Sequence, residues 1–75
     1  MLQDLRNNPD IQILEDADFV YEGKPAHRVV AIVRGIEVQI VQTRKDDPTL
    51  LVKVGNGIRL VHYSHIVEHL TRRLG

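Results

Sequence analysis

Residues 27–43, HRVVAIVRGIEVQIVQT, contain the pattern that decides the fold. The run is rich in Val and Ile, which favour β-strands, and Arg34-Gly35 interrupts it. If these two residues form a hairpin loop, the facing pairs on one side are all apolar: Val33–Ile36, Ala31–Val38 and Val29–Ile40. The pairs on the other side are mixed: Ile32–Glu37 and Val30–Gln39. One apolar face and one mixed face are typical of an antiparallel sheet packed on one side.

A second interpretation keeps residues 29–42 as one long strand bent at Gly35. Bent strands of this kind close small barrels. The bent strand would place Arg34 on the inner face, however, so we favour the hairpin, although Arg-Gly is a weaker turn pair than Asn-Gly.

A second hairpin is predicted downstream, in residues 49–62, TLLVKVGNGIRLVH. A three-residue loop at 55–57 would use Gly57 as its left-handed residue. The predicted facing pairs are Val54–Ile58, Val52–Leu60 and Leu50–His62. In this register Lys53 and Arg59 lie opposite each other on the outer face, which is unfavourable unless an anion or an acidic side chain is nearby.

The flanking segments complete the expected elements. Upstream, a turn of helix at Leu2–Leu5 precedes two short strands, 11–13 and 19–21, and a turn at 22–25. Downstream, Ser64 is expected to cap a final helix. The apolar side of that helix would carry Ile66, Val67, Leu70 and Leu74, and its polar side His65, Glu68, His69 and Arg72.

The predicted fold is mainly β, with about five antiparallel strands and a C-terminal helix. Over residues 18–70 this layout resembles small SH3-like or Sm-like barrels, or a curled sheet; an α+β arrangement, with a flat sheet and the helix on one face, is the alternative. We expect one domain, divided into an acidic leader (1–17), a β core (18–63) and the helix (64–74). SH3-like barrels serve as protein-interaction, dimerisation and nucleic-acid modules, so the resemblance implies binding without naming the partner.

Composition limits the chemistry. The chain has 75 residues and no cysteine, which excludes disulfides, thiolate metal sites and Cys nucleophiles. A chain of this size buries only about 60% of its unfolded surface, so packing or oligomerisation must stabilise it. Nothing at the N-terminus resembles a signal peptide, and no apolar run approaches the ~20 residues of a membrane span. We therefore expect a cytoplasmic protein without membrane contact.

The zero net charge hides an asymmetry. Residues 1–22 hold six acidic side chains and one basic one, whereas residues 23–75 hold nine basic and four acidic ones. The two parts could simply pair within the fold, or the basic part could bind a phosphate backbone. The candidate nucleic-acid- or partner-binding residues are Arg28, Arg34, Arg44, Lys45, Lys53, Arg59, Arg72 and Arg73. The zero net charge and the three aromatic residues count against a dedicated nucleic-acid protein.

His65 to His69 reads H-x-x-E-H, a zinc-peptidase signature. Nothing after His69 could supply a further ligand, so we expect no catalysis, no metal and no cofactor; His62, His65 and His69 remain weak candidates for a metal or pH-sensing site.

The sequence thus predicts a non-catalytic, regulatory binding module. Its expected partner is another protein or a second copy of itself. The half-apolar stripe of Val30 and Ile32 supports that view, unless the terminal helix covers it. Nucleic acid is the alternative partner.

Overall fold

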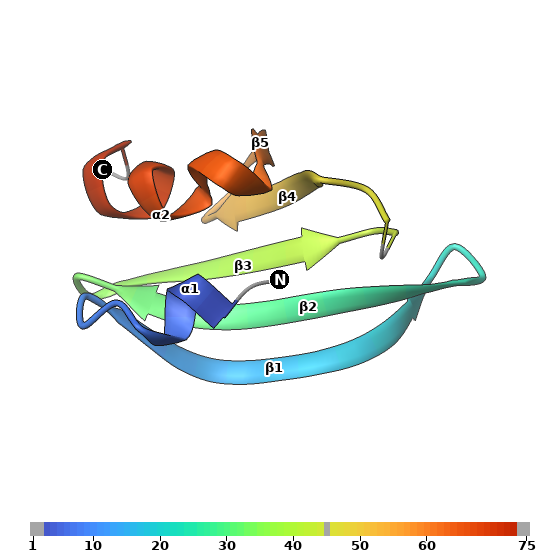
Figure 1. Ribbon diagram of the computed structural model, residues 1–75, viewed down its shortest axis with the longest axis horizontal. Helices are drawn as coiled ribbons and strands as arrows, with labels where there is room; N and C mark the ends of the chain where they lie inside the picture. The colour runs from blue at the N-terminus through green and yellow to red at the C-terminus, as the bar shows by residue number, and fades with distance from the viewer. Residues whose placement is uncertain (1–2, 45, 74–75) are drawn as a thin grey trace.

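The computed structural model describes residues 3–44 and 46–73 (Figure 1). A single helical turn, α1 (Gln3–Arg6), precedes five strands. The strands are β1 (Ile11–Tyr21), β2 (Lys24–Val33), β3 (Ile36–Gln42), β4 (Thr49–Val54) and β5 (Gly57–His62). The chain then forms a 3₁₀ turn (Tyr63–His65), a short α2 (Ile66–Glu68) and a π-helical turn (His69–Arg73), together called the C-terminal helical segment.

The predicted mainly β fold, with five antiparallel strands and a C-terminal helix, is confirmed. The strands form one sheet in the order β1-β2-β3-β4-β5, and every neighbouring pair is antiparallel. Figure 1 shows the sheet curling strongly along β1 and β2. It does not close, because β1 and β5 are not hydrogen-bonded neighbours. The chain therefore adopts the curled-sheet form of the prediction and not a closed barrel, so the edge strands β1 and β5 each have one side without a neighbouring strand among the described residues.

The hairpin predicted at Arg34-Gly35 is confirmed, and the single bent strand is wrong. Val33 pairs with Ile36, and the predicted register continues along the whole ladder. Arg34 and Gly35 have φ angles of 52° and 81°. Positive φ at both loop positions is typical of the type I′ turn, whose twist matches that of antiparallel strands.

The register predicted for the second hairpin is wrong by one residue. Val54 pairs with Gly57, so the loop contains only Gly55 and Asn56. Gly55 has a φ of 57°, and a two-residue loop beginning with such a glycine is a favoured hairpin connection. Because side chains alternate along a strand, this one-residue shift exchanges the two faces of β5. Lys53 pairs with Ile58 and Arg59 with Val52, so the predicted Lys53–Arg59 opposition does not occur.

The two short strands predicted before residue 22 are one continuous strand, β1. A bulge between Ile13 and Glu15 shifts its pairing with β2 by one residue. Asp16 therefore lies opposite Val29 on the core side of the sheet, two residues after the bulge. The turn that follows contains only Glu22 and Gly23.

One face of the sheet, the core face, carries the hydrophobic core. Leu5 of α1 and Ile66 and Leu70 of the C-terminal helical segment pack against the same cluster of strand residues, so both helical pieces cover this face. The buried strand members of the cluster are Ile11, Val29, Ala31, Val33, Val38, Ile40, Leu50, Val52 and Val61. Val30 and Ile32 alternate with these residues and lie on the opposite, outer face, away from the terminal helix. Within the described residues, no helix has the length and apolar character needed to cross a membrane.

Two features of the predicted helix are corrected. Ser64 lies inside the 3₁₀ turn and does not cap α2, whose first turn has no side-chain cap. His69, expected on the polar side, is only 9% exposed. It begins the π-helical turn, whose wider winding departs from the 3.6-residue spacing on which the expectation rested.

Two glycine substitutions test the two-residue loop. Gly55→Ala should cost about 1 kcal/mol of unfolding free energy, because Ala is strained at positive φ. Gly57→Ala should be neutral or stabilise by about 0.5 kcal/mol, since its new methyl group meets only the Val54 carbonyl oxygen, at 3.4 Å. Urea denaturation measures both changes. A three-residue loop, with Gly57 in the left-handed conformation, would give the reverse order.

Candidate functional site

β5 forms an open edge of the sheet. Among the described residues it pairs with β4 alone. In a two-residue hairpin the residues beside the loop form a hydrogen-bonded pair, and such pairs alternate along the ladder. Tyr63 N donates to Pro48 O over 2.7 Å one step beyond the strand, which agrees with this alternation. The backbone groups of Ile58, Leu60 and His62 therefore point away from β4, toward the open edge.

The same three residues place side chains on the outer face. Ile58 is 64% exposed and Leu60 is 67% exposed, whereas Val61, on the core face, is buried. Leu60 lies beside Leu51 of β4, which is half-buried. An edge strand that combines an outward-pointing backbone with exposed large apolar side chains is a ready template for pairing with another chain.

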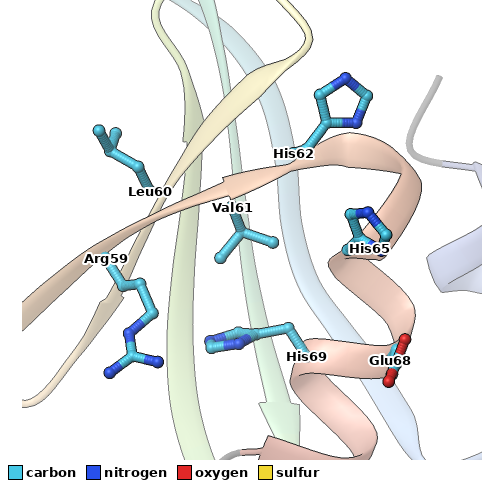
Figure 2. Close-up of a pocket in the computed structure, with 7 residues that line it drawn as sticks. All are labelled: Arg59, Leu60, Val61, His62, His65, Glu68 and His69. Atoms are coloured by element: carbon cyan, nitrogen blue, oxygen red, sulfur yellow. The ribbon is translucent and has the colours of Figure 1, made fainter.

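A pocket of about 250 Å³ lies on the other side of β5, between the strand and the C-terminal helical segment (Figure 2). Figure 2 shows Arg59 and His69 reaching from opposite walls, with Val61 between them. His65 lies on the first turn of the helical segment, whereas Leu60 points away from the pocket. The pocket therefore joins one guanidinium, one carboxylate and three imidazoles to a small apolar surface.

His62 connects the edge strand to the helical segment. Its Nδ1 accepts a hydrogen bond of 3.2 Å from the backbone of Ser64 and lies 2.7 Å from the Ser64 hydroxyl. The ring stacks on Tyr63, with 5.2 Å between ring centres. The His62 side chain therefore caps the 3₁₀ turn, a role predicted from the sequence for Ser64. This contact fixes the turn from β5 into the helical segment.

The weak metal candidates do not converge. Within the described part of the chain, no group of three or more His, Asp or Glu side chains is arranged to hold a metal ion. The rings of His62 and His65 are 6.2 Å apart, and Figure 2 shows His62 directed away from His69. Glu68 points to the far side of the helix from Arg59.

The predicted basic residues are spread over the molecule and do not share one face. Arg28 and Lys53 lie on the outer face, and Arg59 on the core-face side of β5. Arg34 occupies the β2–β3 loop, Arg44 follows β3 and lies 3.4 Å from Asp46, and Arg72 is exposed on the helical segment. Lys45 and the side chain of Arg73 lie outside the described residues.

Part of the charge asymmetry is paired within the fold. Arg28 donates to Glu15 across the β1–β2 ladder over 2.8 Å, and its guanidinium carbon lies 5.8 Å from the centre of the Phe19 ring. Its Nε is buried and has no hydrogen-bond partner among the described residues. These contacts make Arg28 a structural link between two strands, which leaves it less available to an external phosphate.

A second charged cluster joins α1, β1 and β2. Asp16 contacts both Arg6 and His27, and the other ring nitrogen of His27 lies 2.7 Å from Asp18. Because ionised carboxylates only accept hydrogen bonds, both contacts of the ring are made together only when each nitrogen carries a proton. The hydrogen bond from Arg6, followed by those with His27, lowers the pKa of Asp16 despite the opposing effect of burial.

Comparison with known proteins gives no match among family models, curated proteins or solved structures.

Sequence reasoning missed the exposed side of β5 and the Asp16–His27–Asp18 cluster. Ile58 to Val61 contain apolar residues on both faces, so alternation alone does not choose the register. Gly55-Asn56, however, is itself a two-residue hairpin signal that could have found it. The cluster depends on the bulge at residue 14, which leaves no signal in the local sequence.

Asp16→Asn should destabilise the chain at neutral pH, because it removes a carboxylate held by Arg6 and His27. The lowered pKa of Asp16 means that its contribution is complete above the unfolded-state value of about 3.9 and is lost as the pH falls through the folded-state value. The stability difference between wild type and variant should therefore close in acid. Urea denaturation across a pH series measures this difference.

Asp10→Asn is the matched control, since the Asp10 carboxylate makes no ion pair among the described residues. It should show no such closing difference. A gap between Asp16→Asn and wild type that stayed constant into acid would contradict the charge network.

Proposed function

We propose that the chain is a non-catalytic protein-interaction module that associates with a second copy of itself through the open edge of β5. The observation that carries the proposal is the exposure of Ile58 and Leu60 on a strand whose backbone points outward at the same positions. An additional antiparallel strand would satisfy that backbone and cover those side chains.

The sequence of β5 is complementary to itself. Residues that pair across a sheet lie on the same face, and neighbours along a strand lie on opposite faces. A two-fold axis perpendicular to the sheet must therefore pass at one residue of β5 and not between two residues. An axis at Leu60 would place the two Leu60 side chains together on the outer face, with each Ile58 opposite the other copy's His62. It would place Arg59 opposite Val61 on the core-face side. An axis at Arg59 would oppose two guanidiniums, which is unfavourable.

Energetics indicate a weak dimer. Full burial of a Leu or Ile side chain contributes about 1.5–3 kcal/mol. Association costs on the order of 4–15 kcal/mol in lost translational and rotational freedom. The four side chains at the centre of the interface therefore contribute roughly 6–12 kcal/mol if fully buried, which is of the same order as this cost, and the added backbone hydrogen bonds contribute modestly. Such an interface suits a regulated or concentration-dependent association.

Nucleic acid is the weaker candidate. The basic side chains do not form one surface among the described residues, and Arg28 and Arg44 lie beside carboxylates. Of the three aromatic side chains, Phe19 packs edge-on against Tyr21, at 6.3 Å between centres, and Tyr63 stacks on His62. These packed rings are poorly placed for base stacking. The cytoplasmic location expected from the sequence stays a prediction.

Leu60→Lys tests the interface. The change would place two like charges on the two-fold axis, so the variant should remain monomeric at concentrations where the wild-type chain dimerises. Sedimentation velocity measures the assembly state, and a melting temperature that rises with concentration in the wild type should become constant in the variant. Far-UV circular dichroism checks that the variant stays folded, which we expect because Leu60 is 67% exposed.

Val20→Lys is the matched control. Val20 is 71% exposed and lies on β1, the opposite edge strand. This variant should dimerise as the wild type does. A wild-type chain that stays monomeric up to its solubility limit, or a Leu60→Lys variant that still dimerises, would refute the β5 interface.

A further inference from the structure

The pocket beside β5 is lined by one guanidinium, Arg59, one carboxylate, Glu68, and three imidazoles. Arg59 projects from the core-face side of the strand, where its cross-strand neighbour is the buried Val52. Figure 2 shows its guanidinium facing the ring of His69 across the pocket, with His65 one turn earlier on the helical segment. Glu68 supplies the pocket's only carboxylate among the described lining residues, and it points away from Arg59.

Arg59 is placed differently from the other arginines that the structure describes. Arg6, Arg28 and Arg44 each reach a carboxylate within ion-pair distance, whereas Arg59 reaches none among the described residues. Arg34 and Arg72 also make no ion pair there, but they do not line this pocket. The Arg59 guanidinium has five N–H donors in a planar fork, and the low-polarity surface of Val61 lies beside it. A guanidinium in such a concavity, without an internal counter-ion, is suited to an external anion.

We propose that this pocket binds a phosphate-type oxyanion, with Arg59 as the principal ligand and His65 as a further donor from the helical segment. The guanidinium fork matches two oxygens of a phosphate group in a bidentate pair. The His65 imidazole approaches from the helical segment, so donors reach a tetrahedral anion from two sides. A carboxylate can accept the same fork, but its two oxygens lie in one plane, whereas a tetrahedral anion has further oxygens for donors that approach from the other wall.

The size of the pocket limits the ligand to a small anion or to one terminal phosphate group. Its volume of about 250 Å³ is below the range of roughly 300–1,000 Å³ that is usual for sites of drug-sized molecules. The phosphate could be free inorganic phosphate or the head of a larger phosphomonoester. Both share the chemistry that Arg59 recognises.

The test is a two-dimensional amide NMR titration of the full chain with sodium phosphate, sodium sulfate and sodium chloride at equal ionic strength. Phosphate and sulfate should give saturable shifts at Arg59, Val61, His65 and His69, whereas chloride should give none at these residues. A simple phosphomonoester is the fourth probe. Tighter binding than phosphate would assign the larger molecule as the source, and equal or weaker binding would assign the free ion.

Arg59→Gln should weaken phosphate binding about tenfold or more, the scale expected for losing charge-assisted hydrogen bonds to one guanidinium. Arg72→Gln is the matched control. Arg72 is exposed on the helical segment that forms the other wall of the pocket, but it does not line the pocket. This variant should bind phosphate as the wild type does. Equal shifts with chloride and phosphate, or unchanged affinity in Arg59→Gln, would overturn the proposal.

This site does not depend on the proposed dimer. Leu60 is one of the residues that line the pocket, but its side chain projects from the face of β5 opposite to Arg59, so the Leu60→Lys variant should still bind phosphate. Loss of phosphate binding in Arg59→Gln alone, and of dimerisation in Leu60→Lys alone, would show that the two functions are separate.

Discussion

The structure depends on burying a single face of one antiparallel sheet. The β2–β3 hairpin establishes that face, because Val29, Ala31 and Val33 alternate with residues of mixed polarity and pair with apolar residues of β3. Leu5, Ile66 and Leu70 then have only one apolar surface to cover, and both helical pieces pack on it. Among the described residues, no element packs on the outer face of the sheet. The exposure of Ile58 and Leu60 follows from this one-sided packing.

The predictable part of the fold is the part in which alternation and turn chemistry agree. At Arg34-Gly35 both signals give the same register, and the structure has it. At Gly55-Asn56 they do not agree, because Val and Leu occupy both faces of β4 and the loop must choose between two registers. The difference is a single residue, yet it decides whether Leu60 is buried or exposed. Local pattern therefore predicts the sheet but leaves the register of its β5 edge undetermined.

The charged residues are less predictable for a different reason. Their roles depend on which strand lies beside which, and on the bulge that turns Asp16 and Asp18 toward His27. Part of the negative charge in the first third of the sequence is thereby neutralised by ion pairs with basic side chains of α1 and β2. Arg59, at the opposite end of the strand order, makes no ion pair among the described residues, and the same is true of Lys24, Arg34, Lys53 and Arg72. The net charge of zero conceals this difference, because it counts the charges that form ion pairs in the fold together with the charges that do not.

The open edge, the thin core and the unpaired cation of β5 are linked by the position of this strand. β5 contributes one buried side chain, Val61, to the core, so it adds little stability to an isolated chain. Any ligand that binds only the folded form, whether a second copy on the outer edge or an anion between β5 and the helical segment, stabilises it by mass action. Two copies joined at Leu60 would carry one pocket each, on either side of the two-fold axis, because Arg59 and Leu60 project from opposite faces of the same strand. An anion that holds the helical segment against β5 would order this strand before it pairs. Less conformational entropy would then be lost when a second copy binds. Because an axis at Leu60 also places Arg59 opposite Val61 of the other copy, an anion held by Arg59 would lie directly beside the paired strands.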